Sequence, residues 1–300
     1  MGETAVGRPS ASFAVNSETV FYGVFGDPVR HSKSPVMLGE AFRAAGMNAV
    51  YGAFHVTPDA LGSAVEGVRA LGFRGVNVTI PHKVRVMEYL DEIDATARKA
   101  GAVNTIVNEG GRLIGYNTDG IGYVRSLKEE TGASIEGSSI LMLGAGGAAR
   151  GVAHALAAEK PSRMWIANRS AGKAEALVSE LAGSSDCIGI GWDGIDHIIG
   201  KVDIIVNTTP IGMHPNTEEM PVDPALLREG TIVSDLIYNP LSTKLLMHAE
   251  QAGAKVHGGL GMFVYQGAYA FEYWTGAPAP VEAMRAAVLR AMEPPGGGER

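Results

Sequence analysis

The run SILML (139–143) followed by GAGGAA (144–149) determines the fold class of this 300-residue chain. The first five residues have the length and apolar character of a buried strand, and a helix-forming stretch begins at the second motif. In that context Gly144 permits a tight turn, Gly146 lets the backbone approach a pyrophosphate, and Ala149 allows the helix to pack closely on the strand. The alternative interpretation of this motif is a tight strand-to-helix turn that binds no ligand. We predict a Rossmann-type dinucleotide site, with the phosphates at the helix N-terminus.

The residues after the next predicted strand (164–167) indicate which nicotinamide cofactor is bound. An NAD site carries an acidic residue there, which holds the ribose 2′-hydroxyl. Here the chain reads Asn168, Arg169 and Ser170 instead. Arg169 can pair with a 2′-phosphate, with Ser170 and Lys173 as further contacts, although an arginine after a strand is also common as a solvated charge. NADP is therefore the expected cofactor.

Short apolar runs alternate with stretches of helical period on both sides of this motif. After it, strands are predicted at residues 164–167, 188–190, 202–207, 231–236 and 255–256, and helices at 148–158, after Met262 and at 281–291. Before it, strands are predicted at 20–25, 50–56 and 75–80, helices at 34–45 and 58–71, two helical stretches up to residue 100, a β-hairpin over 104–116, and a helix from 119 to about 130. Such alternation implies parallel sheets covered by helices.

The expected fold class is α/β with two domains, an N-terminal α/β substrate domain with a mostly parallel sheet and a Rossmann-type doubly wound NADP-binding domain. We expect residues 19–122 to form the substrate-binding catalytic domain, completed by C-terminal helices over 262–292. Residues 123–261 are expected to form the NADP-binding domain. Flexible tails are expected at 1–18 and 293–300, which are rich in glycine and small or polar residues.

Composition narrows the class of partner. A formal net charge of −7 argues against nucleic acid or an acidic membrane surface, because both reward a basic field. Cys187 is the single cysteine, so no intramolecular disulfide can form, and a cytoplasmic location is expected. No apolar run reaches the length of a membrane span. The expected partner is a small molecule bound by a monomer or homodimer, and we assign no metal site.

Polar residues gather at three places where predicted strands or loops end, the usual location of ligands in such sheets. The first cluster is HSKS (31–34), where Ser32 and Ser34 suit a carboxylate at a helix start, although Ser34 is also an ordinary N-cap residue. The second is NVTIPHK (77–83), in which Asn77 and Thr79 point to one face of the strand. The clusters at 31–34 and 77–83 therefore both predict polar side chains that line a ligand site.

The third cluster contains Asn104 and Asp119, and it completes a candidate acid/base unit with Lys83 from the second. Carbonyl reduction requires a proton donor, because an alkoxide forms as hydride arrives. Taken alone, Lys83 is an ordinary solvated lysine and Asp119 an ordinary N-cap. We predict that together they are the catalytic pair.

The sequence resembles the shikimate dehydrogenase family from about Tyr22 to about Tyr273. The motifs that carry this resemblance occur in family order: HSKSP (31–35), NVTIPHK (77–83), AVNT (102–105), GYNTDG (115–120), GAGGAA (144–149), NRS (168–170), NTTPIGM (207–213), DLIYNP (235–240) and GGLGMFVYQGA (258–268). Two positions depart from the family. Ser170 replaces a common threonine, and His82 stands where an apolar aromatic residue is common.

The resemblance implies an NADP-dependent oxidoreductase that interconverts 3-dehydroshikimate and shikimate on the route to chorismate and the aromatic amino acids. It implies Lys83 and Asp119 as the catalytic pair. The implied substrate ligands are Ser32, Ser34, Asn77, Thr79, Asn104, Tyr238 and Gln266. The implied NADP contacts are Gly144, Ala145, Gly146, Gly147, Ala148, Asn168, Arg169, Ser170, Lys173, Leu236 and Gly259. For Tyr238 and Gln266 the resemblance is the sole argument.

Two alternatives remain at this point. A quinate or quinate/shikimate dehydrogenase using NAD is disfavoured by the serine pair and by Arg169. A regulator that senses a nucleotide without turnover predicts a lost acid/base pair, whereas Lys83 and Asp119 are both present.

Overall fold

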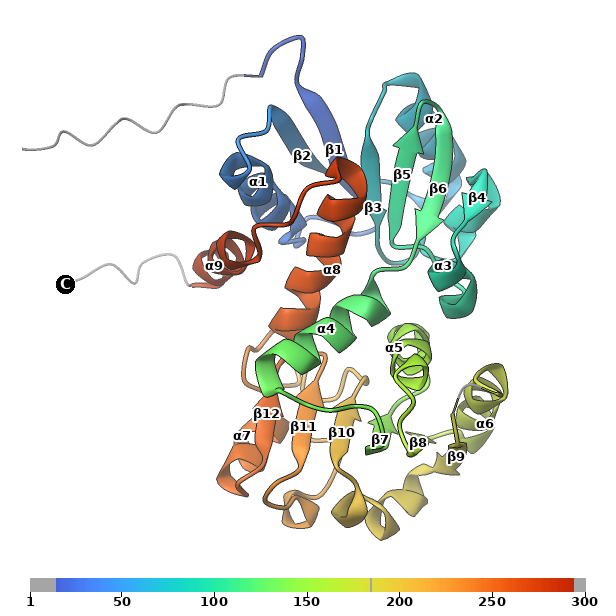
Figure 1. The fold of residues 1–300 in the computed structure, drawn as a ribbon, viewed down its shortest axis with the longest axis vertical. Coiled ribbons are helices and arrows are strands. Elements are labelled where there is room, and N and C mark those ends of the chain that lie inside the picture. Colours follow the sequence, from blue (N-terminus) through green and yellow to red (C-terminus); the bar gives the residue numbers. More distant parts are fainter. Residues whose placement is uncertain (1–14, 184, 294–300) are drawn as a thin grey trace, which may run out of the picture.

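The computed structural model describes residues 15–183 and 185–293. Most of the two predicted tails, residues 1–14 and 294–300, lies outside the described residues. The chain forms two six-stranded sheets, one above the other in Figure 1, with helices packed on each. Among the described residues, no helix is long and apolar enough to cross a bilayer.

The first sheet has the strand order β2-β1-β3-β5-β6-β4. Its strands are β1 (Val20–Gly26), β2 (Ala49–His55), β3 (Gly75–Val78), β4 (Glu92–Ile93), β5 (Thr105–Glu109) and β6 (Arg112–Tyr116). β1 is parallel to β2 and β3, while β5 runs antiparallel to β3 and β6. The predicted hairpin is thus confirmed as β5-β6, whose turn residues Gly110 and Gly111 have φ values of 62° and 101° that favour glycine.

The second sheet is fully parallel and doubly wound, with the order β12-β11-β10-β7-β8-β9. Its strands are β7 (Ser139–Leu143), β8 (Arg163–Asn168), β9 (Cys187–Gly191), β10 (Ile204–Asn207), β11 (Ile232–Asp235) and β12 (Lys255–His257). The order reverses between β7 and β10. A crevice opens at such a switch point, outside the carboxyl ends of the strands, and the glycine-rich turn after β7 borders it.

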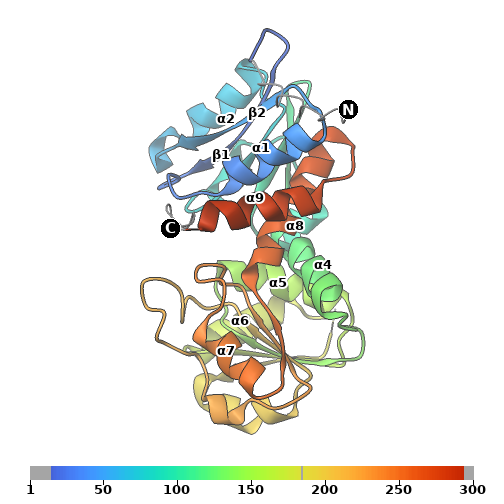
Figure 2. The ribbon, with the colours of Figure 1, turned by 90° about the vertical axis from the view of Figure 1, so that its left-hand side faces the viewer.

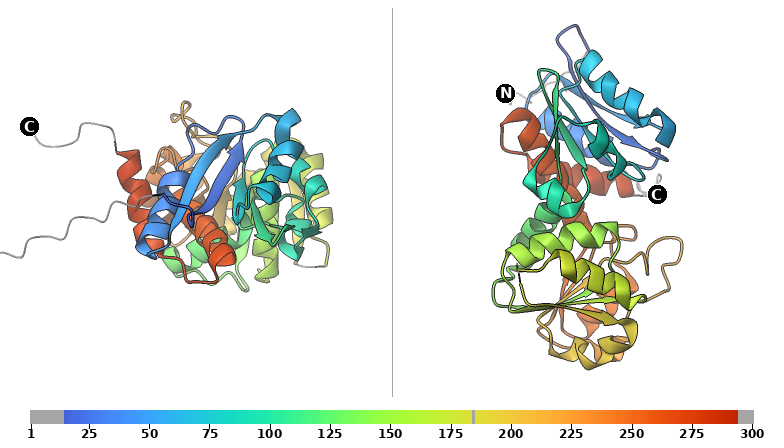
Figure 3. Two further views of the ribbon diagram at one scale, coloured as in Figure 1. Left: turned by 90° about the horizontal axis from the view of Figure 1, so that it is seen from above. Right: turned by 90° about the vertical axis from the view of Figure 1, so that its right-hand side faces the viewer.

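Nine α-helices are assigned among the described residues. They are α1 (Ser34–Ala44), α2 (Leu61–Ala70), α3 (Ala95–Ala100), α4 (Asp119–Thr131), α5 (Gly147–Ala158), α6 (Ala171–Glu180), α7 (Lys244–Gln251), α8 (Gly259–Thr275) and α9 (Val281–Met292). One face of the second sheet packs against α4, α5 and α6, and the other against α7 and the 3₁₀ turns over 192–201. Figure 3 shows α5 and α6 side by side on their face.

Helices α4 and α8 connect the two sheets, and glycines let them touch. A Cβ on Gly122 would lie 2.7 Å from the backbone nitrogen of Gln266, and one on Gly261 would lie 2.0 Å from Ser126 Oγ. Figure 2 shows α9 returning to lie beside α1 on the first sheet. Trp274 of α8 is buried there and donates to the Ile106 carbonyl at 2.9 Å. The C-terminal helices therefore complete the core of the first sheet.

The local structure differs from the predictions at several places, and helices α6 and α7 were not among the predicted elements. The first of the two helical stretches expected up to residue 100 is a 3₁₀ segment (85–89), and the two-residue strand β4 follows it. A strand this short leaves no periodicity to read. Helix α8 begins at Gly259 rather than after Met262. Glycine has low helix propensity, so the glycines at this position did not predict a helix start. Gly259 is required there because a Cβ would lie 2.1 Å from the Leu236 carbonyl oxygen.

A buried histidine ties α4 to the second sheet. His257 Nε2 lies 2.6 Å from Ser126 Oγ on α4, and Nδ1 lies 2.8 Å from Ser234 Oγ on β11. Burial, reinforced by repulsion from Arg285, lowers the pKa of His257 to about 4. The imidazole is therefore neutral in the folded protein at pH values where an unfolded chain protonates it.

We expect this histidine to make the fold acid-sensitive. Because its pKa is lower in the folded than in the unfolded state, its contribution is fully present above about pH 6.5 and is lost as the pH falls towards 4. Between pH 7.5 and pH 5 the free energy of unfolding should drop by about 2 kcal/mol through this residue alone. Urea unfolding of the wild type and of His257→Gln at both pH values measures it. An equal drop in both proteins would contradict the assignment.

Candidate functional site

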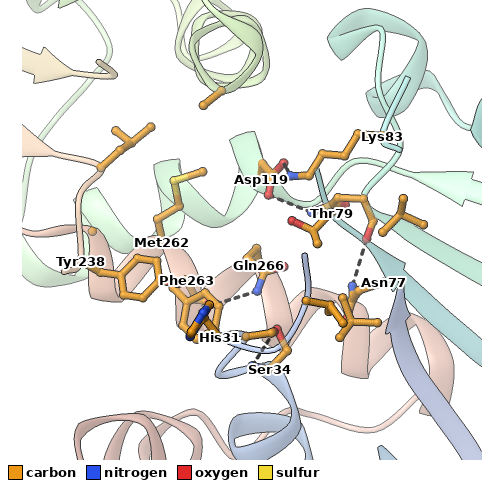
Figure 4. A pocket seen from close by; sticks show the side chains of 18 of the residues that line it. His31, Ser34, Asn77, Thr79, Lys83, Asp119, Tyr238, Met262, Phe263 and Gln266 are labelled. Atoms are coloured by element: carbon orange, nitrogen blue, oxygen red, sulfur yellow. Dashed lines mark hydrogen bonds and ion pairs between the residues drawn. The ribbon is translucent and has the colours of Figure 1, made fainter. Parts of the chain in front are cut away.

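A cavity of about 420 Å³ lies between the two sheets, and both contribute its walls. Its polar lining comes from the ends of strands, the starts of helices and, at Gln266, the interior of α8 (Figure 4). The residues of the first sheet, its connecting turns, α1 and α4 that line it include His31, Ser32, Ser34, Asn77, Thr79, Lys83, Asn104 and Asp119. Those of the second sheet and α8 include Ala148, Leu236, Tyr238, Gly259, Met262, Phe263 and Gln266. All nine predicted catalytic and substrate residues thus line one cavity.

Sheet register brings Lys83 and Asp119 together. Thr105, the first residue of β5, pairs with Asn77 near the end of β3 on one side and with Tyr116 at the end of β6 on the other. The chain leaving β3 therefore passes close to the chain leaving β6. Lys83 follows the first strand and Asp119 the second, so they meet at the same edge of the sheet.

The Lys83 Nζ atom donates to Asp119 Oδ2 at 2.6 Å. The two side chains are 30% and 16% exposed, so solvent screens the pair only partly. Asp119 is the first residue of α4, and the N-cap is Thr118. The plain interpretation of Asp119 as an N-cap is therefore wrong. Its carboxylate is directed towards the lysine instead (Figure 4).

Asn104 orients this carboxylate. Its Nδ2 donates to Asp119 Oδ1 at 2.9 Å and to Thr118 Oγ1 at 2.9 Å, while its Oδ1 accepts from the Thr118 backbone at 2.8 Å. The side chain is 2% exposed. Because both amide hydrogens are engaged, Asn104 acts in this structure by holding Asp119 in place, and its remaining surface lines the cavity.

Asn77 is also held by its neighbours. Its Nδ2 donates to the Asn104 carbonyl at 3.1 Å and to Thr105 Oγ1 at 3.0 Å, and its Oδ1 accepts from Tyr51 at 2.7 Å. Burial raises the pKa of Tyr51 well above its ordinary value, opposed by a hydrogen bond with Ser34, so the phenol stays protonated as a donor. Tyr51 was not predicted as part of the site, because nothing in a strand residue's sequence shows which strand its hydroxyl will face.

The two serines stand at the start of α1. Ser34 is the first helical residue, Lys33 is the N-cap, and the Ser34 backbone nitrogen donates to Ser32 Oγ at 3.2 Å. No side chain caps this N-terminus in the manner expected of Ser34 as an N-cap. Both hydroxyls and the helix start face the cavity, an arrangement that suits a carboxylate.

The opposite wall is formed by the loop after β11 and by α8. The Tyr238 ring stacks on Phe263, with ring centroids 5.0 Å apart, and burial raises the pKa of its phenol. Gln266 Nε2 donates to the Phe263 carbonyl at 2.8 Å. Figure 4 shows Tyr238 on the far side of the cavity from Lys83, with Gln266 between them. Phe263 and Met262 were not predicted, since an apolar helix residue looks like core in the sequence.

A second hollow of about 500 Å³ and a third of about 270 Å³ adjoin the glycine-rich turn, and both are lined by Ala145, Gly146, Asn168 and Arg169. Gly144, which lines the second, has φ 108°, a conformation that favours glycine, and a Cβ there would lie 2.6 Å from Thr208 Oγ1. The first turn of α5 carries no side-chain cap and no acidic residue. Its free N–H groups are therefore available to an anion, as a pyrophosphate requires.

The third hollow collects the residues predicted to hold a 2′-phosphate. Arg169, Ser170 and Lys173 line it together. Within residues 15–183 and 185–293, no carboxylate lies within ion-pair distance of Arg169 or Lys173, so both charges remain available to a ligand. Gly147, the first residue of α5, is the one predicted cofactor residue that lines none of the three hollows.

The loop after β10 forms a wall of the second hollow that was not assigned from the sequence. Thr208, Thr209, Pro210, Ile211, Met213, His214, Pro215 and Asn216 line it. The polar residues Asn-Thr-Thr directly after an apolar strand are the feature of the sequence that could have predicted this loop as part of the site. The buried Asp235 accepts from Asn207 at 3.1 Å, from Thr243 Oγ1 at 2.7 Å and from the Ile237 backbone at 3.1 Å, and so ties this loop to the one that carries Leu236.

Three family models match the chain. They are described as the shikimate dehydrogenase substrate binding domain (residues 24–106), shikimate/quinate 5-dehydrogenase (126–224) and the shikimate 5′-dehydrogenase C-terminal domain (259–289). A relative from Geobacillus sp. (strain WCH70), named shikimate dehydrogenase (NADP(+)), is 51% identical over 271 residues, covering 90% of this chain and 98% of its own length.

Solved structures of this family are also similar to this chain. A shikimate dehydrogenase crystallised in complex with NADP⁺ is 47% identical, with a TM-score of 0.87 over 94% of this chain and 98% of that one. A quinate dehydrogenase from Corynebacterium glutamicum, in complex with NAD, is 30% identical with a TM-score of 0.85, over 91% of this chain and 99% of that one. On sequence, fold and motif content, this chain belongs to the shikimate dehydrogenase family.

Proposed function

We propose that this protein is an NADP-dependent shikimate dehydrogenase, which interconverts shikimate and 3-dehydroshikimate in the biosynthesis of chorismate and the aromatic amino acids. The observation that carries the proposal is the contact of Lys83 with Asp119 at 2.6 Å inside a cavity that both sheets line. The names of the Geobacillus relative and of the complex with NADP⁺ support the activity and the cofactor.

NADP supplies hydride acceptance and donation when it is bound. The N–H groups at the start of α5 suit its pyrophosphate, and Arg169 with Ser170 and Lys173 suits its 2′-phosphate. Ala148, Leu236 and Gly259 line the cavity that also holds Lys83 and Asp119, so these residues are positioned to contact the nicotinamide end. The chain therefore offers contacts along the whole length of a dinucleotide.

Lys83 and Asp119 act on the reacting oxygen of the substrate in this proposal. Lys83 Nζ gives a proton to that oxygen during reduction of the ketone and takes it back from the hydroxyl during oxidation. Asp119 hydrogen bonds to the same ammonium and orients it, and Asn104 fixes the carboxylate in turn. General acid/base catalysis of this kind accelerates a reaction by about 10² to 10⁴.

The substrate carboxylate belongs at the start of α1. Ser32 and Ser34 present two hydroxyls there, next to a helix N-terminus that favours negative charge. Asn77, Thr79, Tyr238 and Gln266 then line the space in which the ring hydroxyls lie. The lining is polar on the side of the first sheet and aromatic at Tyr238 and Phe263, which is suited to a small polyol ring with one apolar face.

Initial rates with shikimate and with quinate, each with NADP and with NAD, test the proposal. We expect the highest kcat/KM with shikimate and NADP, because Arg169 has no carboxylate beside it that could hold a ribose 2′-hydroxyl. The quinate dehydrogenase among the similar structures makes NAD-dependent quinate oxidation the competing result. Binding of NADP without any turnover would instead favour the regulator.

We also propose the domain organisation and setting that accompany this activity. Residues 19–122 with the C-terminal helices form the substrate-binding domain, and residues 123–261 form the NADP-binding domain. The first sheet shares its core with α8 and α9, which supports this division. A cytoplasmic location, supported by the single cysteine, and a monomer or homodimer complete the proposal.

A further inference from the structure

The turn that carries Lys83 is attached to the protein in an unusual way. Ile80 and Val84 are 73% and 66% exposed, whereas His82 between them is 1% exposed. The polar residue is inside and the apolar residues are outside, the reverse of the usual pattern. The buried imidazole of His82 therefore needs a hydrogen-bond partner in the protein interior.

His82 meets that requirement with a single directed bond. Its Nε2 lies 2.6 Å from the carbonyl oxygen of Val56, which follows β2, and a carbonyl can only accept, so Nε2 carries the hydrogen. Val56 is itself held, because its nitrogen donates to the Gly26 carbonyl at 3.1 Å. The bond thus connects the turn to a rigid part of the first sheet.

Backbone bonds hold the turn on its other sides. The Val103 nitrogen donates to the Lys83 carbonyl at 2.7 Å, and the His82 nitrogen donates to the Thr79 carbonyl at 2.9 Å. These bonds fix Lys83 relative to β3 and β5. The His82 ring supplies the buried restraint towards β2, and it does so from the residue directly before the lysine.

We propose that His82 is a positioning residue for the reaction, and that its bond to the Val56 carbonyl holds Lys83 in the position beside Asp119 from which it exchanges a proton with the reacting oxygen. This rests on the proposed function of Lys83. A side chain displaced by about 1 Å can cost a factor of roughly 10² in rate, so one hydrogen bond outside the cavity can have a large catalytic effect.

Three variants separate this role from ordinary packing. His82→Phe keeps a ring of similar size but removes the donor. His82→Gln keeps a terminal N–H₂ that reaches about as far as Nε2. Arg85→Met is the matched control, because Arg85 Nη1 also spans from this turn to the chain after β2, at 3.1 Å from the Pro58 carbonyl, but on the exposed side.

We expect His82→Phe to lower kcat for shikimate by roughly 10- to 100-fold while KM for NADP changes less than about twofold. His82→Gln should recover most of the loss, and Arg85→Met should match the wild type. A kcat of His82→Phe near the wild-type value would overturn the proposal. So would failure of glutamine to restore the rate, because ring packing and not the N–H would then matter. If the phenylalanine variant does not fold, His82→Asn, whose amide is too short to reach Val56, replaces it.

A second measurement is independent of turnover. The rate at which a small amine-reactive reagent labels Lys83, followed by peptide mass spectrometry, should rise several-fold in His82→Phe and stay unchanged in the other two variants. Unaltered labelling in His82→Phe would contradict the positioning role. An inactive wild type that still shows the labelling change would instead count against the proposed function alone.

Discussion

Replacing Lys83 with methionine should lower kcat for shikimate oxidation by about 10²- to 10⁴-fold while KM for shikimate stays within a few-fold of the wild type. Methionine keeps the length and volume of the side chain and removes the ammonium. The serines at the start of α1 and the opposite wall at Tyr238 are untouched, so ground-state binding is retained. The proton that the reacting oxygen needs then has no donor at this position.

Lys128→Met is the matched control for that variant. Lys128 is also ion-paired, with Glu159, but it lies on α4 away from the cavity and its side chain is 42% exposed. An exposed pair contributes at most about 1 kcal/mol, so stability and kcat should both stay close to those of the wild type. A Lys83→Met enzyme with normal kcat and a greatly raised KM would show that Lys83 only binds substrate, and the acid/base role would have to be abandoned.

Replacing Arg169 with alanine should raise KM for NADP by about 10- to 150-fold and leave the reaction with NAD nearly unchanged. A charge-assisted hydrogen bond to a phosphate contributes about 1.5 to 3 kcal/mol, and each 1.4 kcal/mol is tenfold in binding. NAD has no 2′-phosphate, so it loses nothing by the change. Arg169 is exposed, and its removal creates no cavity.

Arg163→Ala provides the comparison on the same strand. Arg163 begins β8, pairs with Asp186 at 2.7 Å and lies over the Trp165 ring, remote from the turn at the other end of β8. The kcat and KM of Arg163→Ala should match those of the wild type with either cofactor. Steady-state rates of the wild type, Arg169→Ala and Arg163→Ala with NADP and with NAD test whether Arg169 binds the 2′-phosphate. Equal losses with NADP and NAD in Arg169→Ala would refute the 2′-phosphate assignment, since such a pattern means general damage to the cofactor groove.

Local signals were sufficient for most elements of the fold. The glycine-rich turn after β7 was predicted because strand, turn and helix are contiguous there, and Gly144 at φ 108° shows the conformation that this turn requires. The β5-β6 hairpin was predicted for the same reason. Helix α8 and the 3₁₀ segment at 85–89 were predicted less well. At the start of α8, Gly259 is required by the Leu236 backbone and Gly261 by the Ser126 and Glu130 side chains, contacts that helix propensity does not show.

The site was predicted unevenly. Lys83 and Asp119 were found, as were Ser32 and Ser34, since charged and hydroxyl residues at strand and helix ends are visible in the sequence. Tyr51, Phe263 and the loop after β10 were missed as site residues. Each of these looks like a core or turn residue until its neighbours are known. His82 belongs to the same class, because its partner is a backbone carbonyl 26 positions away.

The sequence by itself determined most of the strands and helices, the dinucleotide turn and the arginine proposed to select NADP, because each depends on residues adjacent in the chain. Only the tertiary structure decided that an ammonium and a carboxylate 36 positions apart lie 2.6 Å from each other. That contact depends on β5 pairing with both β3 and β6 in one register. A shift of one residue in this pairing would move the chain that leaves β3 relative to the chain that leaves β6, and pairing between distant strands is set by the packing of the whole sheet.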